Sequence, residues 1–205
     1  MTMLLLIRHA ETDLAGTFCG HLDPALNQRG LAQIPALLRE LEQYSIQGLY
    51  ASDLRRARQT AEAIAARFGL QCHIREGLRE LFFGRWEGLR WEEIELRDPQ
   101  EAKIWAADYS LRDFPSGENL HDFRIRVHRE VDAILSGSNH SLSAVVTHAG
   151  VMRTVLTDYA GLSLEQAWQQ TKDYGAIIRA STSVASAVTS NREEKCNGKI
   201  GTEAP

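Results

Sequence analysis

Residues 3–9 read Met3-Leu4-Leu5-Leu6-Ile7-Arg8-His9, five apolar side chains in a row followed at once by two polar ones. A continuous apolar run, in contrast to an alternating one, is typical of a strand buried on both faces of a parallel sheet. A second such run, Ala144-Val145-Val146-Thr147, ends in the same way at His148. The two runs predict two buried strands, each with a histidine at its carboxyl end.

A helical pattern follows the first strand. We expect a helix to begin at Asn27 and to be kinked at Pro35, because proline removes one backbone hydrogen-bond donor. Its apolar face is predicted from side chains spaced three and four residues apart, namely Leu31, Ile34, Leu38 and Leu41.

Strand-like and helical patterns then alternate along the chain. The expected strands are 48–51, 71–75 and 176–178, and the expected helices are 52–68, 120–134 and 150–159. Ser52 is expected to be the N-cap of the first of these helices and Gly69 to end it. This order predicts an α/β fold, a three-layer, doubly wound and mainly parallel sheet flanked by helices.

The size and composition are those of one globular domain. The chain has 205 residues, of which 43% are hydrophobic and 24% charged, and its formal net charge is −4. We expect a single domain over residues 1–181, followed by a polar tail, 182–205, that frays. The acidic balance argues against nucleic acid as a partner.

The chain shows no sign of export or of membrane insertion. Its apolar start is too short for the core of a signal peptide or for a membrane span. The three cysteines, Cys19, Cys72 and Cys196, lie far apart and form no disulfide framework. We therefore expect a cytoplasmic protein that has no membrane partner.

The carboxyl ends of the buried strands are the expected site. Ligands of open α/β sheets bind there, and both His9 and His148 are delivered to that edge. One histidine at such a place is more often structural or solvated than functional. Two of them, one beside Arg8, favour a functional site.

Two further clusters carry polar chemistry. Residues 52–61 read Ser-Asp-Leu-Arg-Arg-Ala-Arg-Gln-Thr-Ala, with three arginines where the helix dipole prefers acids. These arginines form either a solvated basic face or a clamp in which one of them binds an anion. Residues 78–88 combine carboxylates, aromatic side chains and two glycines in an expected loop.

Taken together, these stretches resemble the histidine phosphatase superfamily, also called the phosphoglycerate mutase-like family, over residues 3–180. The family's Arg-His-Gly-Glu-Thr resembles Arg8-His9-Ala10-Glu11-Thr12, and its Leu-Thr-x-x-Gly resembles residues 26–30. Its Ser-x-Leu-x-Arg-Ala-x-x-Thr-Ala, Leu-x-Glu-x-x-x-Gly-x-Trp-Glu-Gly and His-x-Gly motifs resemble residues 52–61, 78–88 and 148–150.

The resemblance implies the fold of that family and a phosphomonoesterase that works through a phosphohistidine. It places the nucleophile on His9, and Arg8 and Arg56 around the phosphate. It further implies that His148 donates to a phosphoryl oxygen and that Glu80 is the general acid. Glu87 is the local alternative to Glu80, although its Trp-Glu-Gly setting favours a packing role.

The same resemblance implies the substrate contacts. Two residues depart from the family pattern, because Ala10 replaces a glycine and Ala15 replaces an asparagine that donates to phosphate. Thr12, or backbone N–H groups near Cys19 and Gly20, are expected to replace that contact. The expected substrate-binding set is therefore Arg8, Thr12, Cys19, Gly20, Arg56 and His148.

No metal or cofactor is expected. The remaining histidines, which we interpret as solvated, are His21, His73, His121, His128 and His140, and none forms a metal-binding motif. A glycine-rich loop for a dinucleotide or a nucleoside triphosphate is also missing from the sequence. The positive charge for an anion must then come from arginine.

The expected partner is a small-molecule phosphomonoester, and the oligomeric state is not predicted. Residues 97–120, with Trp105, Tyr109 and Phe114, are expected to cap the pocket and to stack on an apolar or heteroaromatic leaving group. Residues 114–119 and 173–175 most resemble the α-ribazole 5′-phosphate phosphatases of cobalamin biosynthesis. The alternatives are a broad-specificity phosphatase, a phosphoglycerate mutase-type phosphotransferase and a non-catalytic phosphate-binding module.

Overall fold

A five-stranded sheet organises the chain in the computed structural model, which describes residues 3–107, 114–137 and 139–181. The strands are β1 (Met3–Arg8), β2 (Gly48–Ala51), β3 (Cys72–Ile74), β4 (Leu142–Thr147) and β5 (Ile177–Ser181). Their order is β3-β2-β4-β1-β5, and only β5 runs antiparallel to its neighbour. The predicted doubly wound, mainly parallel α/β sheet is thereby confirmed.

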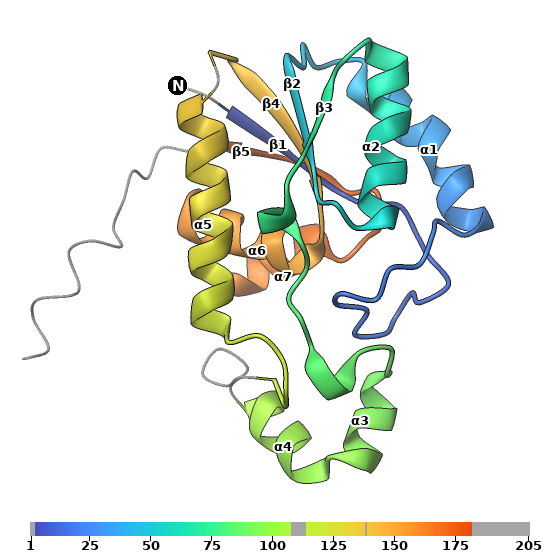
Figure 1. Cartoon of the computed structure of the whole chain (residues 1–205), viewed down its shortest axis with the longest axis vertical. Coiled ribbons are helices and arrows are strands. Elements are labelled where there is room, and N and C mark those ends of the chain that lie inside the picture. Colours follow the sequence, from blue (N-terminus) through green and yellow to red (C-terminus); the bar gives the residue numbers. More distant parts are fainter. Residues whose placement is uncertain (1–2, 108–113, 138, 182–205) are drawn as a thin grey trace, which may run out of the picture.

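Helices cover both faces of this sheet (Figure 1). One face packs on α1 (Gln28–Leu41) and α2 (Arg55–Phe68), through Leu5 and Ile7 of β1. The other packs on α5 (Leu120–Gly137), α6 (Ala149–Asp158) and α7 (Leu164–Thr171), through Leu4 and Leu6. Successive side chains of β1 thus enter two different cores, which explains its unbroken apolar run.

The start of α2 differs from the prediction. The helix begins at Arg55 with Leu54 as its N-cap, so Ser52 is not the cap. The hydroxyl of Ser52 instead accepts a hydrogen bond from the Leu54 N–H, at 3.3 Å, within the turn before the helix. At the other end Gly69 adopts a left-handed conformation and closes the helix, as predicted.

The buried face of α1 also differs from the prediction. Asn27 caps the helix as expected, but Leu31 is 56% exposed, and Gly30 faces inward in its place. A Cβ at position 30 would lie 2.1 Å from the carbonyl oxygen of Glu11. This close approach of two backbones sets the rotation of α1, and the periodicity of leucines could not reveal it.

A smaller lobe projects from the sheet (Figure 1). It contains α3 (Trp91–Arg97) and α4 (Pro99–Ala107), which follow the short 3₁₀ helices η1 (Glu76–Leu78) and η2 (Gly84–Trp86). Trp86 is buried there, in edge contact with Phe18, Trp91 and Trp105. Of the expected cap, Tyr109 lies outside the described residues, as does the expected tail 182–205.

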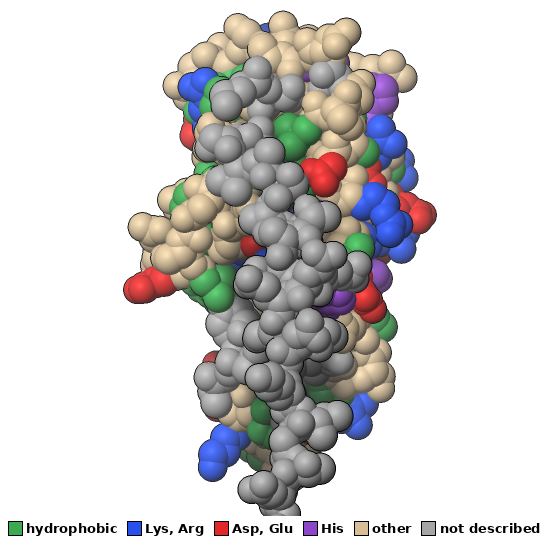
Figure 2. Space-filling model, turned by 90° about the vertical axis from the view of Figure 1, so that its left-hand side faces the viewer, with side chains coloured by type: hydrophobic (Ala, Val, Ile, Leu, Met, Phe, Trp, Pro, Cys, Tyr) green, Lys and Arg blue, Asp and Glu red, His purple; other side chains and the backbone are tan. Residues whose placement is uncertain are grey.

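None of the described helices is long and apolar enough to span a membrane. On the face shown in Figure 2, Lys and Arg side chains lie among those of Asp and Glu.

Candidate active site

The two predicted histidines lie side by side where β1 and β4 end. These strands pair in parallel with Arg8 opposite Thr147, so the residues that follow them emerge at the same level. The N–H of His9 donates to the carbonyl of Thr147 at 3.0 Å. Both imidazoles are buried, and their ring centroids lie 5.0 Å apart.

The hydrogen bonds of His9 define which ring nitrogen carries the proton and which carries the lone pair. Nδ1 lies 2.8 Å from the carbonyl oxygen of Ala10, which can only accept, so Nδ1 carries the proton. The Nε–H of Arg56 points at Nε2 from 3.2 Å. Burial, Arg56 and Arg8 all hold the pKa of His9 well below its ordinary value. His9 is therefore a neutral imidazole with a lone pair on Nε2.

Arg56 is the inward-facing member of the arginine cluster on α2. It is only 1% exposed, whereas Arg55 and Arg58 face solvent. Its Nη1 donates to the carbonyl of Leu22 at 2.6 Å and its Nη2 to that of Gly20 at 2.7 Å. Arg55 and Arg58 therefore form a solvated face, and Arg56 is the member of the cluster that faces inward; its binding of an anion stays a prediction.

Arg8 is held by the end of α7 and the residues that follow it. Its Nη1 donates to the carbonyls of Thr171 and Lys172 at 3.0 and 2.5 Å. Its guanidinium stacks 3.9 Å above the ring of Tyr174, which also lies 5.5 Å from the ring of His9. Burial lowers the pKa of Arg8, but a guanidinium remains charged. We did not identify Tyr174 as a site residue from the sequence.

Glu80 reaches the same site from the loop after η1 and is buried. One carboxylate oxygen accepts the N–H of Leu81 at 2.9 Å, and the other accepts the N–H of Gly150 at 3.1 Å. A Cβ at Gly150 would lie 2.2 Å from the carboxylate. The glycine of the His-x-Gly motif therefore leaves room for Glu80.

A second missed residue, Arg126 of α5, holds the backbone around Glu80. It donates to the carbonyls of Gly77 and Arg79 at 3.0 and 2.9 Å, and to that of Glu80 at 3.3 Å. Glu118 pairs with the same guanidinium at 2.7 Å. Neither residue stands in the motifs around the histidines, and the three carbonyls lie 46 to 49 positions before Arg126 in the sequence.

Glu87 contacts the loop whose carbonyls bind Arg56, as the packing role predicted from its Trp-Glu-Gly motif requires. Its carboxylate accepts the N–H of His21 at 2.6 Å. Gly20 has a φ of +51°, and a Cβ there would lie 2.0 Å from the same carboxylate. Gly20 reaches the site through its carbonyl on Arg56.

The remaining predicted substrate contacts, Thr12 and Cys19, have local partners. The hydroxyl of Thr12 is buried and accepts the N–H of Leu14 at 3.3 Å. The Cys19 thiol lies 3.7 Å from the carbonyl of Leu22, and burial raises its pKa. Their roles toward a substrate stay predictions.

Two of the five histidines that we interpreted as solvated are not. His21 donates through Nε2 to the carbonyl of Glu80 at 2.9 Å, and His128 lies 2.7 Å from a carboxylate oxygen of Asp158. His73 and His121 are exposed. Within the described ranges, no group of three or more His, Cys, Asp or Glu side chains is placed to hold a metal ion.

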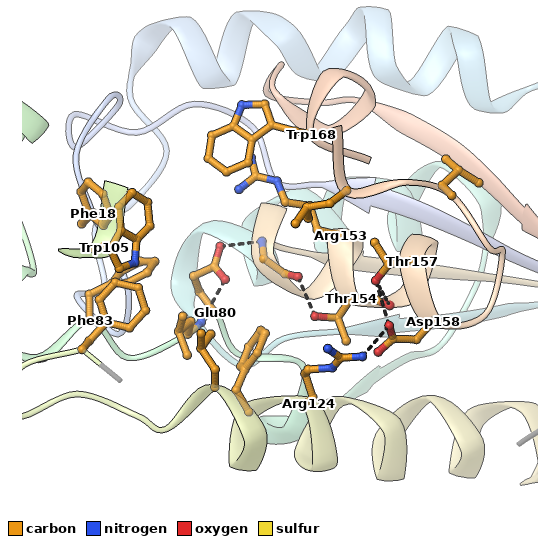
Figure 3. Close-up of a pocket in the computed structure, with 17 residues that line it drawn as sticks. Phe18, Glu80, Phe83, Trp105, Arg124, Arg153, Thr154, Thr157, Asp158 and Trp168 are labelled. Carbon is orange, nitrogen blue, oxygen red and sulfur yellow. Dashed lines mark hydrogen bonds and ion pairs between the residues drawn. The ribbon is translucent and has the colours of Figure 1, made fainter. Parts of the chain in front are cut away.

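A cavity of about 450 Å³ extends outward from Glu80 and Gly150 (Figure 3). Aromatic side chains line one end of it, namely Phe18, Phe83, Trp105 and Phe114, and Trp168 lies above Arg153 at its side. The other end is polar, where Arg124 pairs with Asp158 at 2.8 Å. The cavity therefore has an aromatic end and a polar end, and it reaches Glu80 and Gly150, two residues after His148.

Comparisons with known proteins find relatives of this chain. The family model "Histidine phosphatase superfamily (branch 1)" matches residues 4–187. Phosphoserine phosphatase 1 of Hydrogenobacter thermophilus is 29% identical, covering 82% of this chain and 81% of its own. Adenosylcobalamin/alpha-ribazole phosphatase of Escherichia coli is also 29% identical, over 84% and 86%. The solved alpha-ribazole phosphatase of Shigella flexneri matches with a TM-score of 0.77 and 28% identity, over 87% and 89%.

The two buried histidines make the stability of the fold dependent on pH. Burial and the arginines lower the pKa of both in the folded state. Below about pH 6.5 the unfolded chain takes up protons on them while the folded chain does not, so the free energy of unfolding falls as pH falls. We expect each histidine to contribute about 1.4 kcal/mol per pH unit in this window.

Urea unfolding between pH 7.5 and about pH 5 measures this dependence. His9→Gln and His148→Gln should each flatten the curve, whereas the exposed control His73→Gln should leave its slope unchanged. Equal slopes in all four proteins would show that His9 and His148 are not held neutral.

Proposed function

The chain belongs to the histidine phosphatase superfamily and is a phosphatase, and we propose that it hydrolyses phosphomonoesters through a phosphohistidine at His9. One observation carries this proposal above the others. The bond from Nδ1 to the Ala10 carbonyl keeps the ring proton on Nδ1, so Nε2 carries the lone pair, which accepts a hydrogen bond from the buried Arg56. A neutral nitrogen nucleophile next to a guanidinium suits attack on a phosphoryl group.

In the first step, Nε2 of His9 attacks phosphorus and the bond to the leaving oxygen breaks. Glu80 gives that oxygen a proton, so the alcohol leaves neutral. In the second step, water attacks the phosphohistidine and passes a proton to Glu80. The P–N bond then breaks, its electron pair returns to Nε2, and inorganic phosphate leaves.

Unused donors around His9 support binding of the phosphoryl group. Arg8 Nε and His148 Nδ1 are both buried, and neither has a hydrogen-bond partner among the described residues. Buried polar groups are almost always satisfied, so both atoms suit an anion that arrives with the substrate. Together with Arg56 they supply the charge and the donors, and we propose that no metal ion takes part.

The cavity beyond Glu80 supports a bulky aromatic leaving group. We propose α-ribazole 5′-phosphate as the substrate, because its benzimidazole base can stack on the aromatic side chains at one end of the cavity. The enzyme would then act in cobalamin biosynthesis. Serine would leave most of a cavity of about 450 Å³ unfilled. The names of the relatives include both α-ribazole and phosphoserine phosphatases.

We predict that His9→Ala reduces turnover to below roughly a hundredth of the wild-type rate, because the covalent path is lost. Brief reaction of the wild type with ³²P-labelled substrate should give a phosphoenzyme that is labile in acid and stable in base. His73→Ala, on an exposed face of β3, is the control and should keep full activity. An active His9→Ala would remove the nucleophile from the proposal.

We predict that Glu80→Gln slows the phosphorylation of alkyl phosphates by roughly 10²- to 10⁴-fold. p-Nitrophenyl phosphate should lose less, because nitrophenolate leaves without a proton. Gly150→Ala should act in the same direction, since its methyl group displaces the Glu80 carboxylate, and it should add little to Glu80→Gln. Single-turnover bursts measure this step, and equal losses for both substrates would contradict the role of Glu80.

The substrate is tested by kcat/KM over a panel of α-ribazole phosphate, phosphoserine, sugar phosphates, nucleotides and phosphoglycerates. We predict the highest value for α-ribazole phosphate, and a selective loss on that substrate in Trp105→Ala. A preference for phosphoserine, or a flat profile across the panel, would contradict the proposed substrate and leave the proposed chemistry in place.

A further inference from the structure

Ser52 is in contact with the second histidine of the site. Its hydroxyl oxygen lies 3.0 Å from Nε2 of His148, and both side chains are completely buried. The same oxygen also lies 3.3 Å from the backbone nitrogen of Leu54. The two contacts determine where the protons of this pair lie.

The Leu54 N–H can only donate, so the Ser52 oxygen is the acceptor in that bond. The serine still has one proton of its own to give. Among the described residues, its other hydrogen-bond partner is Nε2 of His148. If Nε2 carried a proton, both partners would donate to the oxygen, and the buried hydroxyl proton would have no acceptor.

We infer that Ser52 donates its hydroxyl proton to Nε2 of His148 and thereby fixes the ring proton of that histidine on Nδ1. Nδ1 is the buried ring atom that has no partner in the described part of the chain. On the function proposed above, this N–H faces the phosphoryl oxygens. Ser52 is then a positioning residue, which acts through His148 without touching the substrate.

The inference matters because His148 is neutral. Burial and the nearby Arg56 lower its pKa well below the ordinary value, so the ring carries a single proton. With that proton on Nδ1 the ring donates to an anion. With the proton on Nε2, a lone pair would face the anion instead, and the interaction would become repulsive.

The wild-type enzyme tests the tautomer directly, by ¹⁵N-edited NMR of histidine ring nitrogens with and without inorganic phosphate. We expect Nδ1 of His148 to be protonated and Nε2 unprotonated in both states, with the signals assigned by their loss in His148→Gln. A proton on Nε2 would overturn the inference without affecting the phosphohistidine at His9, which the His9→Ala experiment tests separately.

Ser52→Ala then measures the contribution of this contact, with Ser143→Ala as the matched control. Ser143 is also fully buried in the sheet, on β4, and its hydroxyl has no hydrogen-bond partner among the described residues. We expect Ser52→Ala to weaken inorganic phosphate binding and to lower kcat/KM roughly 10- to 100-fold, as when the partner that orients an active histidine is lost.

In Ser52→Ala the His148 ring should also populate the Nε2-protonated form, a change that loss of packing alone would not cause. The control should retain the wild-type rate, phosphate affinity and NMR pattern. Wild-type values in Ser52→Ala, or an unchanged tautomer with a reduced rate, would contradict the positioning role.

Discussion

Parallel pairing between β1 and β4 is the constraint on which the rest of the site depends. The register brings Arg8 opposite Thr147, so the two following histidines emerge from adjacent strands at the same depth. Because both strands are buried on two faces, these histidines begin in an environment that disfavours charge. Burial at the end of the sheet is the main reason that their pKa values are lowered, and the nearby arginines lower them further.

Arg56, which is buried, and Arg8, which is half-buried, are held in a way that preserves their charge. Arg56 and Arg8 are held by backbone carbonyls, by the His9 ring and by the face of Tyr174. Carbonyl oxygens and an aromatic face stabilise the two guanidinium groups without cancelling their positive charge, which a carboxylate partner would do. On the proposed function, a phosphate dianion would meet two cations that the protein already holds in place.

Local patterns predicted the parts of the molecule that depend on local sequence. The strands around Leu5 and Val145, the cap at Asn27 and the end of α2 at Gly69 all follow from neighbouring residues. The family motifs named most residues that meet at the histidines. The predictions that were wrong or incomplete share one cause. They concern the roles of Ser52, Leu31, His21, His128, Tyr174 and Arg126. Each depends on a contact between segments far apart in sequence, which a pattern within one segment does not record.

The first turn of α6 carries a consequence for how such an enzyme can change. His148 immediately precedes this helix, and the N–H of Gly150 within it holds the carboxylate of Glu80. The imidazole and the carboxylate are therefore both positioned by one turn of backbone. The aromatic end of the cavity is instead formed by Phe18 and the smaller lobe, whose Trp86 and Trp105 contact Phe18. Selection can change those aromatic side chains one at a time while the imidazole and the carboxylate proposed to react keep their spacing. An architecture divided in this way can retain one chemistry through many changes of substrate.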